Sequence, residues 1–494
     1  MTFKKSFSFL ILLFSVNYTY CQSALTLSLK DAIHLSQINS LDYKISVNTA
    51  RSAFWNYKNY KSSFLPKLSL SGYTPDYYRS INSITLPSGQ ISFVGQNVAN
   101  SSLFLNFAQN IGLTGGNIAI GSSLSRLDNF GNYNNTSYTS IPFTLSYFQD
   151  NLFYNDFKWQ KQIEPLKLQE ARRGYVENLE NISLNTVSQY FDLLLANIQL
   201  KLDQQNLKNI DTLVKITKAR SEIGTVQLNE VLQSKVSLLN AKSALANSTL
   251  NVETAQQSLI RYLNIDKSQL IELTIPDSIT QFEIARGAAL EQAHYNRKYI
   301  VEFKRRRLEA EQALSRTKSE TGPKISIRAN IGLTQTGGTL GQSYRDLLMN
   351  QSVTVGINIP IIDWGVNRSN RKRAEANLEL EKNNIAQQEL AAEQEINYQI
   401  MKWEMQNNQI SISKEVRTLA QQRYDIARQK YALGSITYTD FNNAQLEKDR
   451  AITDYINNLR NYWSMYYLIR RLTLYDFERN KKIDLIDFSK DADW

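Results

Sequence analysis

The sequence predicts a mainly α-helical protein with a smaller β portion, in which long antiparallel coiled-coil helices follow pairs of strands. Proline is absent from residues 166–275, 277–322 and 361–494, and because proline breaks helix interiors, these tracts can hold very long helices. Glycines cluster in residues 71–131 and 322–365, where short runs alternate apolar and polar residues, as strands do. Segments of the first half also recur in the same order in the second half, which indicates two structural repeats.

Residues 1–21 are predicted to form a secretory signal peptide. The basic residues Lys4 and Lys5 precede a short apolar core, and small residues at positions 19 and 21 mark a cleavage site after residue 21. The alternative is a lipoprotein signal with Cys21 acylated, although Tyr20 is bulky where such signals prefer a small residue. Cys21 is the only cysteine, so cleavage would leave a mature chain without disulfides or thiolate metal sites.

An internal repeat organises the rest of the chain. The segment LPKLSL at 65–70 resembles GPKISI at 322–327. Further on, Gly224 and Gly434 each follow an Ala-Arg pair, and each precedes an acidic residue by six positions. The period is far longer than that of a solenoid, which indicates one duplicated unit. We expect the first repeat to cover 22–270, the second repeat 271–477, and a polar C-terminal tail 478–494.

The first repeat is predicted to contain a helix, a β-hairpin at 65–150 with a long insertion, and long helices at 152–223 and 226–263. Apolar residues of the hairpin, such as Leu68 and Leu70, alternate with polar or small ones. The insertion, roughly 81–139, holds a further hairpin in which Leu103 to Phe107 alternate before a Thr-Gly-Gly-Asn turn. The sequence leaves open whether that hairpin joins the sheet or caps a loop.

The second repeat is predicted to contain a helix at 282–320, a β-hairpin at 323–362, and long helices at 366–433 and 436–475. Its strands alternate in the same way, for example at Ile325 and Ile327. One apolar and one polar face suit a barrel wall with lipid outside and water inside, but a soluble half-buried sheet shows the same alternation. The longest helices would reach roughly 100 Å, so they must pair along their length, as in a coiled coil.

The composition points away from nucleic-acid binding and catalysis. The chain has 56 basic and 46 acidic residues, a net charge of +10, but the basic residues are spread along helical tracts, as on solvated helix faces. The two histidines, His34 and His294, have no further histidine or cysteine at metal-binding spacing. The sequence contains no phosphate-binding loop and no nucleophile elbow. We therefore expect no enzymatic activity, no metal or other cofactor, and no nucleic-acid partner.

Three motifs carry a resemblance to a known family. They are an opening helix from Leu29 to Asn39 that leads to Phe64-Leu65-Pro66, the strand exit IPIIDWG at 359–365, and the turn YALG at 431–434 followed by Asp440. With these motifs in this order, the chain resembles the TolC-like outer-membrane efflux proteins (outer-membrane factors). The resemblance extends over about residues 27–477.

The resemblance implies a fold, a location and a function. In such proteins each protomer gives four strands to a twelve-stranded trimeric β-barrel in the outer membrane, and the helices continue it as an α-barrel in the periplasm. The implied function is a passive, porin-like exit duct of a tripartite efflux pump or a type I secretion system. The implied partners are two further copies in a homotrimer, a periplasmic adaptor (membrane fusion) protein, an inner-membrane transporter and outer-membrane lipid.

The resemblance also implies a periplasmic entrance at the tips of the helix hairpins. Matched position by position, the entrance or gate residues are Asp440, Glu230, Asn443 and Tyr431, and the tips that contact the adaptor are Gly224 and Gly434. Ile436 stands where the family often has a basic residue that ties the gate shut, which puts that ion pair in doubt. The alternative for both acids is structural, because carboxylates in the first turn of a helix are stabilised by its dipole.

A second function from another class stays open at this point. A periplasmic coiled-coil scaffold or envelope tether without a pore would explain the long helices, but not the two strand pairs in equivalent positions. The transported substrate cannot be read from the sequence, because specificity in such systems usually resides in the pump.

Overall fold

The computed structural model describes residues 25–130, 134–225, 227–266, 271–433 and 435–483. The predicted signal peptide, with Cys21, lies outside these residues. The chain forms two compact units. One unit combines the chain up to Lys44 with Asn181–Gln281 and Trp403–Leu468, and the other combines Ile45–Glu180 and Phe282–Lys402 with the chain from Ile469.

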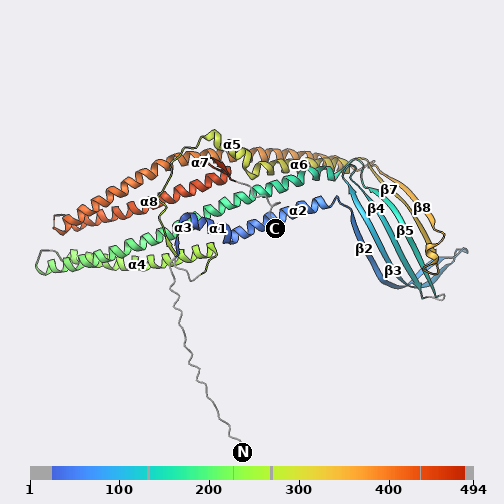
Figure 1. The fold of residues 1–494 in the computed structure, drawn as a ribbon, viewed down its shortest axis with the longest axis horizontal. Helices are drawn as coiled ribbons and strands as arrows, with labels where there is room; N and C mark the ends of the chain where they lie inside the picture. Colours follow the sequence, from blue (N-terminus) through green and yellow to red (C-terminus); the bar gives the residue numbers. More distant parts are fainter. Residues whose placement is uncertain (1–24, 131–133, 226, 267–270, 434, 484–494) are drawn as a thin grey trace, which may run out of the picture. The chain divides into compact units, whose positions relative to one another are not determined.

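The described residues contain eight α-helices (Figure 1), and the lengths of the first four match those of the second four to within one residue. The first four, with 11, 22, 67 and 36 residues, are α1 (Leu29–Asn39), α2 (Leu41–Ser62), α3 (Asp156–Glu222) and α4 (Leu228–Leu263). The second four, with 11, 23, 67 and 36 residues, are α5 (Arg286–Asn296), α6 (Lys298–Glu320), α7 (Val366–Ala432) and α8 (Tyr438–Thr473). A duplicated unit would give such matched lengths, and the repeat remains a prediction that they support.

The single helix expected at 282–320 is wrong, because the backbone leaves the helical conformation at Arg297. This residue is extended, with φ −69° and ψ 150°, and separates α5 from α6. The preceding residue, Asn296, is buried, and its side-chain amide donates a hydrogen bond to the carbonyl of Thr473 at 3.3 Å. Ser40, with ψ 153°, separates α1 from α2 in the same way.

The main sheet is antiparallel and has six strands in the order β2-β3-β4-β5-β7-β8 (Figure 1). Their bounds are β2 (Lys67–Thr85), β3 (Ile91–Ile111), β4 (Gly116–Asn129), β5 (Asn135–Gln149), β7 (Lys324–Gly337) and β8 (Leu348–Asn358). The sheet of this chain therefore has six strands, whereas the resemblance implies that each protomer gives four strands to the barrel. The insertion expected at roughly 81–139 contains all of β3 and all of β4, and these strands pair along the whole length of β4.

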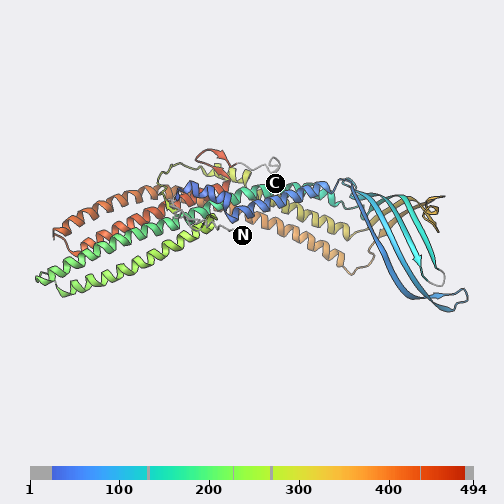
Figure 2. The same ribbon diagram turned by 60° about the horizontal axis from the view of Figure 1, so that its bottom comes forward.

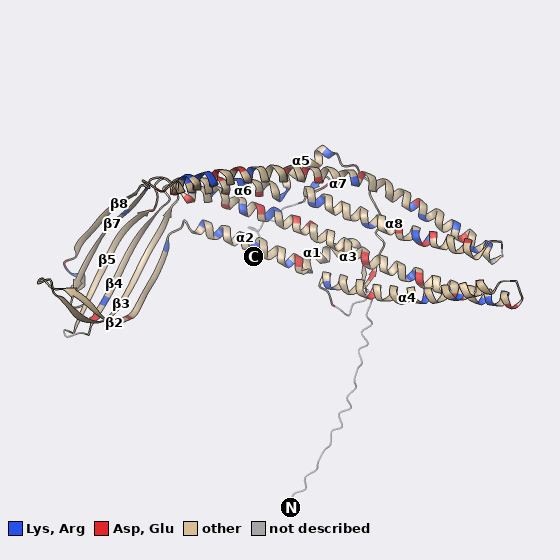
Figure 3. Ribbon diagram, turned by 180° about the vertical axis from the view of Figure 1, so that it is seen from behind, with Lys and Arg blue, Asp and Glu red and all other residues tan. Residues whose placement is uncertain are grey.

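The sheet carries few charges, whereas the helices carry many (Figure 3). Strands β3, β5 and β8 have no charged residue at all. The β2–β3 hairpin also extends beyond its neighbours (Figure 2), because the first seven residues of β3, from Ile91 to Asn97, pair with β2 alone. Among the residues that the structure describes, no helix is both long and apolar enough to cross a membrane.

Five smaller elements complete the secondary structure of the described residues. The strands β1 (Leu25–Leu27) and β6 (Ile271–Leu273) pair in parallel, and a short 3-10 helix, η1 (Gln342–Tyr344), lies between β7 and β8. The strands β9 (Tyr475–Asp476) and β10 (Lys481–Lys482) form a hairpin. The tail expected from residue 478 thus begins with an ordered segment, and residues 484–494 lie outside the described part of the chain.

A buried ion-pair network holds the C-terminal hairpin. Arg470, near the end of α8, donates from Nε and Nη2 to the two carboxylate oxygens of Glu180 at 2.9 and 2.8 Å. Its Nη1 donates to Asp476 in β9 at 2.9 Å. Glu180 is only 2% exposed, and burial raises the pKa of its carboxyl against the opposing effect of Arg470. The network ties α3, α8 and the hairpin together.

In the other unit, buried aromatic residues fill the seam between helices and hold the connecting segments with their polar tips. Tyr190 of α3 is fully buried, and its hydroxyl donates to the carbonyls of Leu27 at 3.0 Å and Thr274 at 2.6 Å. Tyr462 of α8 packs against Trp403, with ring centroids 4.9 Å apart, and donates to the carbonyl of Thr280 at 2.6 Å. These residues combine apolar burial with a satisfied hydroxyl, which suits a helix seam.

Candidate functional site

The two long helix hairpins have backbone bonds at equivalent positions of their turns. After α3, Gly224 has φ +77° and Thr225 donates its backbone N–H to the carbonyl of Arg220 at 2.9 Å. After α7, Ser435 makes the same bond to Lys430, also at 2.9 Å. This pattern ends a helix with a left-handed residue, for which glycine carries no Cβ penalty. Gly434, the equivalent of Gly224, lies outside the described residues.

Asp440 stands in the first turn of α8, where it forms a capping box with Thr437. The Thr437 hydroxyl accepts from the Asp440 backbone N–H at 3.2 Å, and the Asp440 carboxylate accepts from the Thr437 hydroxyl at 2.7 Å and its N–H at 3.2 Å. These bonds, from the hydroxyl first and then the backbone, lower the pKa of Asp440. The exposed carboxylate therefore stays ionised while it also starts the helix.

Glu230 occupies the matching position in α4 without such a cap. It lies in the first turn and is exposed, and Gln227, the N-cap of α4, makes no capping bond with its side chain. The two acids are thus equivalent in sequence but not in bonding. Asn443, one turn beyond Asp440, is exposed as well.

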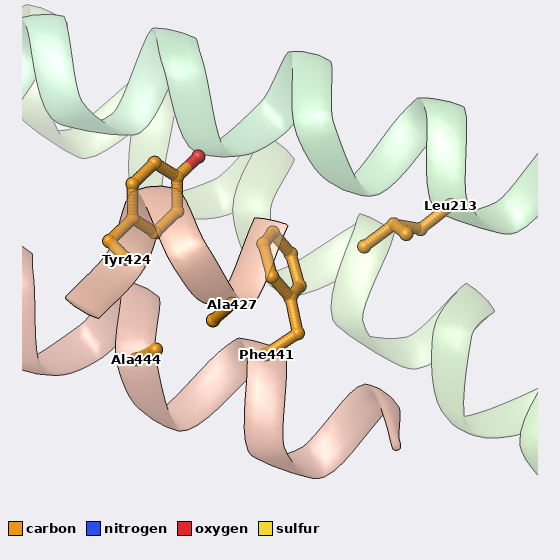
Figure 4. Packing of buried hydrophobic residues seen from close by; sticks show 5 residues of the cluster. All are labelled: Leu213, Tyr424, Ala427, Phe441 and Ala444. Carbon is orange, nitrogen blue, oxygen red and sulfur yellow. The ribbon is translucent and has the colours of Figure 1, made fainter. Parts of the chain in front are cut away.

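Tyr431 belongs to an apolar cluster next to the second turn. The buried centre of the cluster comes from three helices and consists of Leu213, Tyr424, Ala427, Phe441 and Ala444 (Figure 4). Tyr431 stacks on Phe441 with ring centroids 5.2 Å apart, and Ile436 packs against the same cluster. Burial raises the pKa of the Tyr431 hydroxyl. The side chain at 436 thus contributes apolar contact, whereas the resemblance leads to the expectation of a basic residue at this position.

A groove of about 200 Å³ lies beside this cluster, between α3 and the hairpin of α7 and α8. Its lining is apolar at the base and carries two guanidinium groups, and it consists of Asn209, Thr212, Leu213, Ile216, Arg220, Tyr424, Arg428, Tyr431 and Phe441. The sequence pairs Arg220 with Arg428 through the repeat but gives neither a role. Only the packing of α3 against α7 brings both to one groove.

The six-stranded sheet is the second surface with a clear functional character. Directly paired residues of neighbouring strands share a face, so the register defines rows across the sheet. One row is apolar except at its last member: Leu68, Phe107, Ile120, Leu145, Ile331 and Gln351. The adjacent row lies on the opposite face and is polar or small: Ser69, Asn106, Gly121, Thr144, Gly332 and Asn350.

The apolar face lacks a cover among the described residues of this chain. Leu68 is 64% exposed and Ile331 is 44% exposed. On the polar face, Thr144 and Ser146 both donate to the side-chain oxygen of Asn330, at 2.6 and 3.0 Å. An exposed apolar face behind a hydrogen-bonded polar face is the pattern of a wall between lipid and water.

The described residues also bear on metal binding. They hold no group of three or more His, Cys, Asp or Glu side chains close enough to bind an ion. His34 and His294 are both exposed on helices, α1 and α5.

Comparisons with solved structures agree with this architecture. The outer-membrane channel CmeC of Campylobacter jejuni is 16% identical and covers 93% of this chain and 90% of its own, with a TM-score of 0.66. The outer-membrane protein VceC of Vibrio cholerae is 15% identical and covers 90% of this chain and 95% of its own, with a TM-score of 0.63. At this level of identity the likeness concerns the fold, a helical barrel with a β portion.

Two curated relatives match more locally. The toxin and drug export protein A of Aggregatibacter actinomycetemcomitans is 22% identical over 214 residues, which are 42% of this chain and 46% of that protein. An uncharacterised protein of Haemophilus influenzae is 23% identical over 245 residues, 48% of this chain and 53% of that protein. The chain therefore spans about half the length of the curated relatives it matches.

The family model accounts for more of the chain. The model of the outer membrane efflux protein family matches residues 110–264 and 289–471, which are more than half of the 494 residues. The first match begins at the end of β3, so β2 and almost all of β3 precede it. With its helix hairpins, its two-faced sheet and this match, the chain belongs to the outer membrane efflux protein family.

Proposed function

We propose that the protein is a passive exit duct of the outer membrane, through which substrates leave in a tripartite efflux pump or a type I secretion system. The observation that carries this proposal is the two-faced sheet, whose exposed apolar rows suit lipid and whose polar rows suit a water-filled lumen. The long paired helices would continue that lumen into the periplasm. The duct supplies a path, and a separate inner-membrane transporter supplies the energy.

The duct forms only when several copies assemble. Within one copy, β2 and β8 each pair on one side only, so both sheet edges present unpaired backbone groups. Lipid cannot satisfy such groups, and closing the sheet with neighbouring copies satisfies them. We propose a homotrimer, as the resemblance implies.

The entrance lies at the helix-hairpin tips. We assign Asp440 and Glu230 to it as exposed carboxylates that favour cations, with Asn443 and Tyr431 as its polar and aromatic lining. A periplasmic adaptor would contact the turns at Gly224 and Gly434. The groove beside them offers two guanidinium groups, from Arg220 and Arg428, which suit acidic side chains on the adaptor.

Planar-bilayer conductance of the purified protein, with its oligomer mass measured in the same detergent, tests the proposed function. The expected result is a trimer that opens discrete, long-lived channels. A folded monomer or dimer that never conducts would refute the duct and favour the coiled-coil scaffold or envelope tether.

A further inference from the structure

The position of β3 and β4, the two central strands between β2 and β5, relative to the membrane is not fixed by the duct function itself. Strands β3 and β4 lie in the tract that the sequence led us to expect as an insertion, 81–139, and they either belong to the membrane wall or lie outside it as a cap. The two possibilities differ in what surrounds their side chains. A wall strand has lipid on one face and water on the other, whereas a hairpin outside the membrane has water on both.

In the register of the sheet, β3 and β4 continue both the apolar rows of one face and the polar rows of the other. Phe107 pairs with Leu68 of β2 and with Ile120 of β4, and the apolar row continues to Leu145 and Ile331. The adjacent polar row likewise crosses β3 at Asn106 without a break in its alternation. A cap hairpin has water on both faces, so nothing would align its apolar side chains with the apolar face of the strands on either side of it.

The length of the apolar face along a strand matches the length that a transmembrane strand needs. On β7 it extends from Ile325 to Leu333, at every second position of nine residues. A tilted transmembrane strand needs about 9–11 residues. On β3, Leu103 and Phe107 lie within the stretch that pairs with β4, while the extension from Ile91 to Asn97 pairs with β2 alone and reaches beyond that level.

We propose that β3 and β4 are wall strands, so that each copy of this chain gives six strands to the transmembrane pore. This proposal rests on the proposed duct function. Three copies would then supply eighteen strands, three times the six of one sheet, in place of the twelve expected from the resemblance. Because barrel diameter grows roughly linearly with strand number, the β portion would be about 1.5 times as wide as a twelve-stranded one. The extra width suits bulkier substrates than a twelve-stranded pore admits.

Cysteine accessibility in the reconstituted oligomer tests this proposal. Asn106→Cys and Phe107→Cys probe the two faces of β3, and Asn330→Cys and Ile331→Cys are the matched pair on β7, which is a wall strand under either reading. A membrane-impermeant, water-soluble maleimide is the probe. The wild-type protein is the blank, because its only cysteine is Cys21. Retention of the oligomer mass shows that each variant folds.

The expected result is that Asn106→Cys reacts at least about tenfold faster than Phe107→Cys, with a similar ratio for the pair on β7, because lipid shields alternate side chains. Equal, fast labelling of the two β3 variants beside alternating labelling on β7 would overturn the six-strand wall and leave the duct intact. Equal labelling on β7 as well would instead refute the membrane wall, and with it the proposed function.

Discussion

The capping box at the start of α8 allows the structural and the functional roles of Asp440 to be separated. Thr437→Val removes the hydroxyl that accepts from the Asp440 backbone N–H and donates to its carboxylate, but it keeps the charge. Loss of such a cap costs about 1 kcal/mol, so the first turn of α8 should open about fivefold more often. Hydrogen exchange of the tip peptide that contains Asp440 measures this opening directly.

Asp440→Asn is the complementary change. Its amide oxygen can still accept from Thr437, so the tip should keep most of its protection from exchange, while the charge at the entrance is lost. We expect weaker block by a trivalent cation in planar bilayers, because a carboxylate that attracts cations is lost from the entrance. Glu230→Gln is the matched control for charge without a cap, because Gln227 makes no capping bond with its side chain.

The pH dependence follows from the sign of the shift. The bonds from Thr437 lower the pKa of Asp440, so its carboxylate is ionised throughout the neutral range. It loses its charge only when the pH falls below the ordinary pKa of an aspartate carboxyl. Cation block should therefore stay constant between neutral and mildly acidic pH. Wild-type block in Asp440→Asn would show that this carboxylate only caps the helix, and unchanged exchange in Thr437→Val would refute the cap.

Three further predictions concern stability. Arg470→Met should cost about 3–5 kcal/mol in denaturant unfolding, because it leaves Glu180 buried and unpaired. Burial raises the folded pKa of Glu180 above its unfolded value, so the loss of stability in Arg470→Met should shrink as the pH falls through that raised pKa. Adding Glu180→Gln to Arg470→Met should recover part of the lost stability. A loss of stability that does not depend on pH would contradict this account. Gly224 has φ +77°, so Gly224→Ala should destabilise the α3–α4 turn by about 1–2 kcal/mol, as measured by hydrogen exchange. The control is Gly287→Ala, inside α5 with open space around it, which should be neutral or stabilising. Equal effects of the two changes would exclude backbone strain as the cause. Phe441→Ala should cost about 3 kcal/mol and raise exchange in both α7 and α8, and a change confined to α8 would show that the apolar cluster does not couple the two helices.

Much of the helical architecture could be predicted because it depends on local features. The proline-free tracts hold all of α7 and most of α3, which contains Pro165 near its start; both helices have 67 residues. Glycine marks the turn after α3 through its positive φ. The sequence pattern does not indicate the break at Arg297, because no proline or glycine marks it. It coincides with a buried side-chain bond from Asn296 to a carbonyl 177 residues away in the sequence, which local patterns do not report.

For the entrance residues too, local sequence features predict some of the arrangement and tertiary packing decides the rest. The spacing from the tip glycines places Asp440 and Glu230 in the first turns of their helices, as the structure has them. The packing of Ile436 and Tyr431 against Phe441, and the meeting of Arg220 with Arg428 in one groove, depend on how three helices come together. Their role in an entrance remains a prediction.

The sequence by itself determined the long helices, the positions of their turns and the two-faced character of each strand, because helix length and side-chain alternation are properties of neighbouring residues. Only the tertiary structure decided that the sheet has six strands and that β3 and β4 lie within it. Alternation within a single strand does not distinguish a membrane wall from a soluble sheet, whereas strand order is set by pairing between distant segments, such as β5 with β7. That pairing turns separate alternating strands into one continuous apolar face.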